Sequence, residues 1–152
     1  MLDTIRRAVR LPKRSASELK ILTRMQGGAH MKKRDDPQQT VKAYFEGLAA
    51  KDVSRIPWAD NPTLRTPLNP AGGESALISG RKAILDFFAG ILPALGRVKV
   101  VRHFAGEAGW VAAQAGIALA NGKTLSVFDA FHFQKGEIIE QQNHYDSRPA
   151  TG

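Results

Sequence analysis

Apolar positions in residues 35–52 recur at helical spacing. The segment "DDPQQTVKAYFEGLAAKD" places apolar side chains three and four positions apart, which defines one buried face of a helix. Asp36 can cap the first turn, and Pro37 suits the first helical position because no amide donor is needed there. A second helical period spans residues 79–95 and ends at Pro93. The two apolar faces are formed by Val41, Tyr44, Phe45, Leu48 and Ala49, and by Ile84, Phe87, Phe88 and Ile91.

The segment between these two helices is rich in proline and glycine. We interpret "VSRIPWADNP", residues 53–62, as a short helix that Pro57 ends or kinks. "TLRTPLNPAGGES", residues 63–75, has the composition of extended chain and turns. The sequence therefore predicts three helices before the next change of pattern.

From residue 97 the apolar period changes from about 3.6 to about 2, which indicates strands. Asn121-Gly122 and Lys135-Gly136 are expected to form tight hairpin turns. Helices followed by a meander of antiparallel strands predict an α+β domain whose helices pack on one face of a curved sheet. The four predicted strands are residues 97–105, 109–119, 123–133 and 137–146.

The composition limits the chemistry and the organisation of the chain. Its 152 residues suffice for a single domain with a core, and the absence of cysteine excludes disulfides, thiolate chemistry and cysteine-ligated zinc. No apolar run is long enough to cross a bilayer, so we expect a soluble, cytoplasmic protein. We divide the chain into a basic arm at residues 1–34, a folded domain at residues 35–148 and a tail at residues 149–152.

The N-terminal arm carries the charge imbalance of the chain. It contains ten of the 22 lysines and arginines but only two of the 14 acidic residues, so it accounts for the whole formal charge of +8. Three interpretations stay open: an organelle-targeting segment, a tether to nucleic acid or an anionic membrane, and a dispensable tail upstream of a later start at Met25 or Met31. The arm has no Phe, Tyr or Trp residue, so it lacks the aromatic platforms on which bases usually stack.

Asp129 is a carboxylate within the apolar strand "TLSVFDAFHF". Alternation places it on the same side as Val127, Phe131 and Phe133. A buried carboxylate needs a donor or takes up a proton, and the expected partner is Tyr44 on the buried face of the first helix. A tyrosine and a protonated carboxylic acid in an apolar pocket can together stabilise an oxygen that acquires negative charge. The alternative is a purely structural hydrogen bond between the two side chains.

The order of elements resembles the superfamily of nuclear transport factor 2 (NTF2), ketosteroid isomerase and the SnoaL-type polyketide cyclases, over about residues 37–148. "VFDAFHF" is similar to the isomerase strand that carries its oxyanion-hole aspartic acid, with Asp129 on that acid. "KAYFEGLAAKDV" is similar to its first helix, with Tyr44 on the catalytic tyrosine. "FHFQKGEIIEQQNHYD" resembles the closing strands of the superfamily. The resemblance implies a cone-shaped NTF2-like fold, in which helices pack on a curved antiparallel sheet that encloses a pocket.

The chain departs from the relatives in two respects. The general base of the isomerase falls on Thr66, which cannot shuttle a proton at neutral pH. Limonene epoxide hydrolase uses an Asp–Arg–Asp set, and Asp146 matches its terminal aspartate, but "WVAAQAGIAL" supplies neither of the other two residues. In the SnoaL cyclases an aspartate is the acid–base group, a role that the resemblance allows for Asp129.

Further side chains are candidates for the pocket wall. By alternation Gln141, Asn143 and Tyr145 share one face of the last strand, and the family pattern places this face toward the pocket. The sequence shows no metal-ligand spacing, so we expect neither a metal nor a cofactor. With Asp129 and Tyr44 as the predicted catalytic residues, the pocket candidates are Trp58, Thr66, Phe131, Asn143, Tyr145 and Asp146.

The expected function is binding of a small, largely apolar carbonyl or ring compound, coupled to proton transfer of isomerase, cyclase or dehydratase type. Asp129 is expected to serve as acid or oxyanion donor and Tyr44 as second donor. The alternative is a non-catalytic binding or dimerisation module, with the basic arm as a tether to polyanions. A homodimer would form through the outer face of the sheet, for which the expected residues are Val111, Ala113, Phe128 and Ala130.

Overall fold

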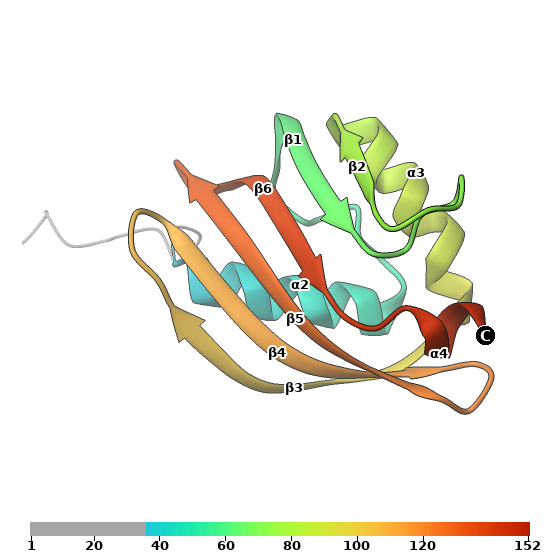
Figure 1. Ribbon diagram of the computed structural model, residues 1–152. Helices are drawn as coiled ribbons and strands as arrows, with labels where there is room; N and C mark the ends of the chain where they lie inside the picture. The colour runs from blue at the N-terminus through green and yellow to red at the C-terminus, as the bar shows by residue number, and fades with distance from the viewer. Residues whose placement is uncertain (1–35) are drawn as a thin grey trace, which may run out of the picture. The chain divides into compact units, whose positions relative to one another are not determined.

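A computed structural model describes residues 36–152 (Figure 1). The predictions made for the basic arm, residues 1–34, lie outside the described residues. None of the helices within residues 36–152 has the length and apolar character that a bilayer crossing requires. The described part consists of three α-helices, one 3₁₀ helix and six strands.

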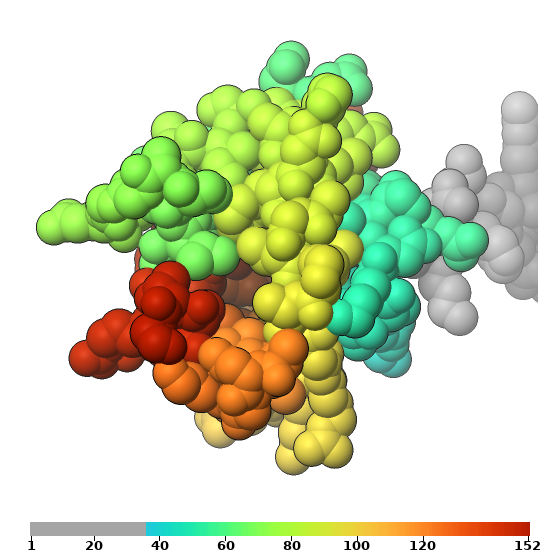
Figure 2. All heavy atoms as spheres, turned by 90° about the vertical axis from the view of Figure 1, so that its right-hand side faces the viewer, coloured from blue at the N-terminus to red at the C-terminus, as the bar shows by residue number. Residues whose placement is uncertain are grey.

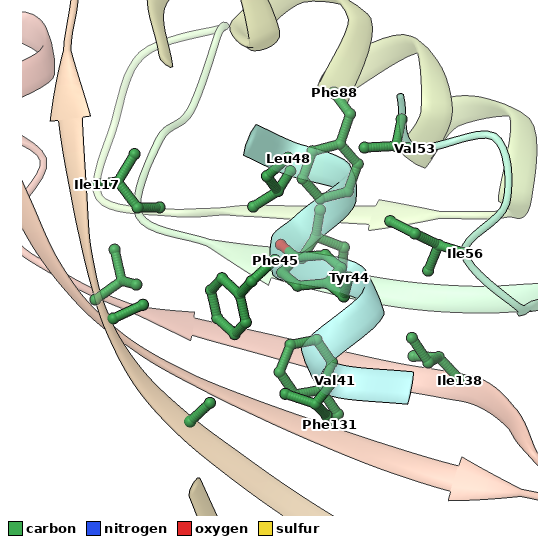
Figure 3. Close-up of a cluster of buried hydrophobic side chains, with 14 of the residues drawn as sticks. Val41, Tyr44, Phe45, Leu48, Val53, Ile56, Phe88, Ile117, Phe131 and Ile138 are labelled. Carbon is green, nitrogen blue, oxygen red and sulfur yellow. The ribbon is translucent and has the colours of Figure 1, made fainter. Parts of the chain in front are cut away.

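Helix α2, Pro37–Ala50, forms where the helical period predicts it. The carboxylate of Asp36 accepts a hydrogen bond from the amide of Gln38 at 3.0 Å, and Pro37 occupies the first turn. The helix ends at Lys51, which adopts a left-handed φ of 60°. Four residues of its predicted apolar face are buried, but Ala49 is exposed. Figure 3 shows Tyr44 within a cluster of apolar side chains.

The predicted short helix at residues 53–62 is wrong. The chain turns after Lys51 and enters strand β1, Trp58–Thr66, which pairs with a further strand that the sequence did not reveal, β2, Ala76–Ser79. Proline lacks an amide donor and fits poorly inside a helix, but it is tolerated at strand starts and bulges. Pro57 immediately precedes β1, and Pro62 lies where the pairing register of β1 with β6 shifts.

The second helical pattern is confirmed as α3, Arg81–Ile91, followed by the 3₁₀ helix η1, Leu92–Ala94. Pro93 lies inside η1, where a proline stops the α-helical hydrogen bonds. Ile84 and Phe88 of α3 are buried, whereas Phe87 and Ile91 are half-buried.

All six strands form one curved sheet in the order β2-β1-β6-β5-β4-β3. The three pairs of the predicted meander are antiparallel, as expected. The unpredicted pair of β1 and β2 is also antiparallel, but β1 and β6 run parallel. The sheet is therefore mixed, and it leaves β2 and β3 as edge strands. The last four strands are β3, Leu95–Ala105; β4, Trp110–Leu119; β5, Thr124–Gln134; and β6, Glu137–His144.

The two predicted turns differ in conformation. Lys135 and Gly136 both adopt a left-handed φ, as a two-residue hairpin turn requires. In the β4–β5 turn only Gly122 is left-handed, and four residues instead of two connect the strands. The predicted tail folds onto this turn as part of helix α4, Arg148–Thr151. Asn121 there donates a hydrogen bond to the carbonyl of Pro149 at 3.0 Å.

Helices α2 and α3 cover the concave face of the sheet (Figure 1). Along β5 the side chains alternate between buried and more exposed positions, and Asp129 is on the buried side. Cross-strand neighbours share a face, and Ala113 pairs with Asp129 while Val111 pairs with Phe131. Val111 and Ala113 thus face the core, and their assignment to the outer face is wrong. Phe128 and Ala130 lie on the outer face as expected.

Candidate functional site

The carboxyl of Asp129 lies on the concave face of β5, and the residue is only 2% exposed. Ala113 on β4 and Asn143 on β6 are its cross-strand partners, so the three side chains form a row across the sheet. Oxygen Oδ1 of Asp129 is buried and has no hydrogen-bond partner among residues 36–152. A buried acceptor without a partner is costly, so this oxygen is poised to receive a donor or carry a proton.

Burial raises the pKa of Asp129 to about 7, because the charged form loses its hydration. The side chain of Asn143 opposes this rise in pKa but does not cancel it. Near neutral pH the carboxyl can therefore both release and take up a proton. This is the property that general acid–base catalysis requires.

Tyr44 reaches the same region from helix α2. Its hydroxyl accepts a hydrogen bond from Nε2 of Gln141 at 2.8 Å, and its ring packs edge-on against Phe131 with centroids 5.0 Å apart. Burial, and next the charge of Asp129, raise the pKa of Tyr44 well above its ordinary value. The hydroxyl thus keeps its proton, and because Gln141 occupies it as an acceptor, that proton is free to be donated elsewhere.

The structure shows no hydrogen bond between Tyr44 and Asp129, the partners that the sequence predicted. The hydrogen bond that the structure shows for Tyr44 goes to Gln141 instead of Asp129. Both side chains line a cavity of about 40 Å³ between α2, α3 and the sheet. Its other lining residues are Leu48, Phe87, Phe88, Ile91, Leu95, Ile117, Leu125, Val127, Asn143 and Tyr145.

The cavity has room for a few water molecules, far below the roughly 300–1,000 Å³ of typical ligand pockets. Half-buried Phe87 and Ile91 of α3 form part of its wall. Figure 2 shows a hollow between α3, the β4–β5 turn and the C-terminal segment. At this volume the cavity is too small to enclose a ring compound.

Thr66 and Tyr145 are joined by a hydrogen bond of 3.0 Å between their hydroxyls. Thr66 is fully buried and also accepts a hydrogen bond from the amide of Leu68 at 3.2 Å. Burial raises the pKa of Tyr145, and the bond with Thr66 opposes that rise. Thr66 thus holds Tyr145 at the cavity wall, a contact created by the parallel pairing of β1 with β6.

Three other predicted pocket residues, Trp58, Phe131 and Asp146, do not line the cavity around Asp129. Trp58 and Phe131 are buried in the core, where Trp58 packs against Phe88 with ring centroids 6.2 Å apart. Asp146 is exposed at the surface, and its carboxylate accepts hydrogen bonds from Arg148. These bonds lower the pKa of Asp146 to about 2. The prediction that Asp146 lines the pocket is therefore wrong, because the chain turns outward after Tyr145.

Gln141 is a functional candidate that we did not select from the sequence. It is fully buried, and its Oε1 has no hydrogen-bond partner within the described residues. Alternation along β6 already placed it beside Asn143 and Tyr145. A buried side-chain amide needs a hydrogen-bond partner. This need, together with the position of Gln141 on the pocket-facing side of β6, is the signal that could have linked it to Tyr44.

No group of three or more His, Cys, Asp or Glu side chains within residues 36–152 is arranged to hold a metal ion. His132 lies on the outer face of the sheet, stacks on Trp110 with centroids 4.7 Å apart and bonds the carbonyl of Ala108. The polar side chains that line the cavity are Asp129, Tyr44, Asn143 and Tyr145.

A family model described as a SnoaL-like domain matches residues 41–141. The chain belongs to the SnoaL-like domain family. This match runs from Val41 within α2 to Gln141 within β6, and so includes both Tyr44 and Asp129. No curated protein matches the sequence.

Solved structures share this SnoaL-like fold. An NTF2-like protein of unknown function from Cytophaga hutchinsonii has a TM-score of 0.63 at 20% identity, covering 80% of this chain and 100% of that protein. A steroid delta-isomerase from Pseudomonas aeruginosa gives 0.59 at 15% identity, with coverages of 72% and 79%. An LEH-like epoxide hydrolase from M. tuberculosis gives 0.57 at 20% identity, with coverages of 72% and 82%. At these identities the likeness shows the fold alone.

Proposed function

We propose that this SnoaL-like domain binds a small, largely apolar compound and exchanges a proton with its carbonyl or hydroxyl oxygen. The observation that supports this function is the carboxyl of Asp129, which is buried, lines the cavity and has a pKa of about 7. The apolar wall of the cavity suits a ring compound. A steroid delta-isomerase among the structural neighbours agrees with such a substrate.

Two donors act on the substrate oxygen in this proposal. Protonated Asp129 gives its proton, or shares it, as negative charge develops on the oxygen, and Tyr44 donates a second hydrogen bond. Gln141 supports Tyr44 by occupying the hydroxyl as an acceptor. The reaction class is isomerase-, cyclase- or dehydratase-like, with Asp129 as the acid–base group and without a contribution from Thr66, whose hydroxyl is engaged by Tyr145.

Binding of 4-nitrophenol and 2-naphthol tests this site, since the phenolate oxygen imitates an oxygen that acquires charge. We expect saturable binding, and a loss of affinity of about tenfold to hundredfold in Tyr44→Phe and Asp129→Leu, because a hydrogen bond to a charged group contributes about 1.5–3 kcal/mol. The measurement is titration by absorbance or calorimetry. Asp60→Asn, at an exposed position of β1, is the control and should bind like the unaltered protein.

Absence of binding by the unaltered protein, or equal affinity in all four proteins, would contradict the proposal. Thermal unfolding of each variant separates a lost donor from a lost fold. Phe87→Ala supplies a further check, since removing this half-buried wall residue should speed the entry of 2-naphthol.

A second candidate function, a dimerisation module, is supported by the outer face of the sheet. Phe104 on β3 and Phe128 on β5 are 40% and 41% exposed. Strand β4 lies between these two strands, and the ring centroids are 5.5 Å apart. Exposed aromatic pairs on a sheet favour association. We propose a homodimer that buries this pair.

Sedimentation equilibrium of the full chain should then show a dimer, and Phe128→Glu should shift it to monomer by placing a charge in the interface. Leu77→Glu is the matched control, because Leu77 is exposed on the distant edge strand β2. A monomer at every concentration would rule out the dimer.

A further inference from the structure

A groove between helix α2 and the edge strand β3 offers more space than the central cavity. Its volume is about 290 Å³, close to the lower limit of about 300 Å³ for ligand pockets. It shares no lining residue with the cavity around Asp129. The groove is lined by Lys42, Phe45, Glu46, Ala49, Val98, Val100 and His103.

The groove has a polar end and an apolar end. Nζ of Lys51, just after α2, donates a hydrogen bond to the carbonyl of Leu95 at 2.6 Å, so the end of α2 lies beside the start of β3. The two elements therefore run antiparallel, as Figure 1 also shows. This direction places Lys42 near His103 at one end and Ala49 near Val98 at the other.

The polar end holds groups that are not fully engaged. Nε2 of His103 is buried and has no hydrogen-bond partner within residues 36–152. Lys42 is exposed, and its ammonium lies 3.8 Å from the carboxylate of Glu46, at the outer limit of an ion pair. An ammonium has three donors, so Lys42 can bind a second carboxylate while it stays close to Glu46.

We propose that this groove binds a medium-chain carboxylate, with its head group at Lys42 and His103 and its hydrocarbon chain along Phe45, Val100 and Val98. The four lining positions of α2 run from Lys42 to Ala49, seven steps or about 10 Å along the helix, which suits a chain such as that of octanoate. A charge-assisted hydrogen bond from Lys42 and a bond with His103 hold the head group. This site does not depend on the function proposed for Asp129.

Calorimetric titration of the full chain with octanoate tests the site. We expect saturable binding that Ala49→Trp weakens by at least about tenfold, because the indole fills the apolar end of the groove. Lys42→Gln should weaken it about fivefold. In NMR spectra the imidazole signals of His103 should shift on addition of octanoate, while those of His132 and His144 stay in place.

Each variant has a matched control on this chain. Ala43→Trp adds the same indole at an exposed alanine of α2 outside the groove, and Lys82→Gln removes a lysine from the similar pair with Asp86 on α3. Both should bind octanoate like the unaltered protein. The proposal is overturned if octanoate shows no saturable binding, or if Ala49→Trp and Ala43→Trp bind it equally.

Discussion

Asp129→Asn should remove a pH-dependent loss of stability of about 4 kcal/mol between pH 4 and pH 8. The pKa of Asp129 rises from an ordinary value of 3.8 to about 7 on folding, because burial penalises the charged form. Below pH 3.8 both states hold the proton, so the folded state bears no penalty. As the pH rises toward 7 the unfolded chain releases the proton and the folded chain retains it, so the free energy of unfolding falls. Above pH 7 the loss is complete.

Urea denaturation of both proteins between pH 4 and pH 8 measures this effect as a difference. Asp52 and Asp146, whose pKa values are lowered by hydrogen bonds from Ser54 and Arg148, titrate in both proteins and cancel. Asp129→Asn should be the more stable protein at pH 8, and Asp60→Asn should follow the unaltered protein. Parallel pH profiles for the unaltered protein and Asp129→Asn would show that Asp129 keeps its charge in the fold.

Phe131→Ala should lower the free energy of unfolding by about 3–5 kcal/mol, the usual cost of removing a buried phenylalanine ring. Phe131 is fully buried on the concave face of β5. Its ring lies 5.0 Å from that of Tyr44 and 6.3 Å from that of Phe45, measured between centroids, so it joins the sheet to α2. Loss of this ring leaves a void beneath the helix that carries the candidate donor.

Phe128→Ala is the control for Phe131→Ala, because it removes the same ring from the opposite face of the same strand. Phe128 is 41% exposed, so we expect a cost of about 1 kcal/mol or less. Denaturant unfolding at low protein concentration avoids a contribution from association. Similar losses in the two variants would contradict the assignment of faces along β5.

Strong periodicity made the main elements predictable. The stripe from Val41 to Leu48 and the Asp36 cap yield α2, and the alternation around Asp129 correctly predicts which side chains of β5 are buried. The segment from Val53 to Pro62 shows neither the helical nor the strand period. Its predicted helix therefore had no periodic support, and the structure has a turn and β1 there. Pairing with β6 across the chain, and not local preference, makes this segment a strand.

The sequence indicated which residues belong to the candidate site, but not which side chains form hydrogen bonds with one another. A carboxylate among phenylalanines and a tyrosine on a buried helical face already pointed to Asp129 and Tyr44. The partner of Tyr44 is 97 positions away, at Gln141, and depends on how α2 crosses the sheet. Asp146 was predicted to line the pocket but does not. The chain turns outward after Tyr145 and places Asp146 beside Arg148 at the surface.

The sequence by itself determined which side chains share a face in α2, α3 and β5, because the helical and strand periods follow from backbone geometry that every residue repeats. Only the tertiary structure decided the parallel pairing of β1, the bond between Thr66 and Tyr145, and the small volume of the cavity. These features depend on strand register and on packing between segments distant in the chain. No local pattern encodes either one.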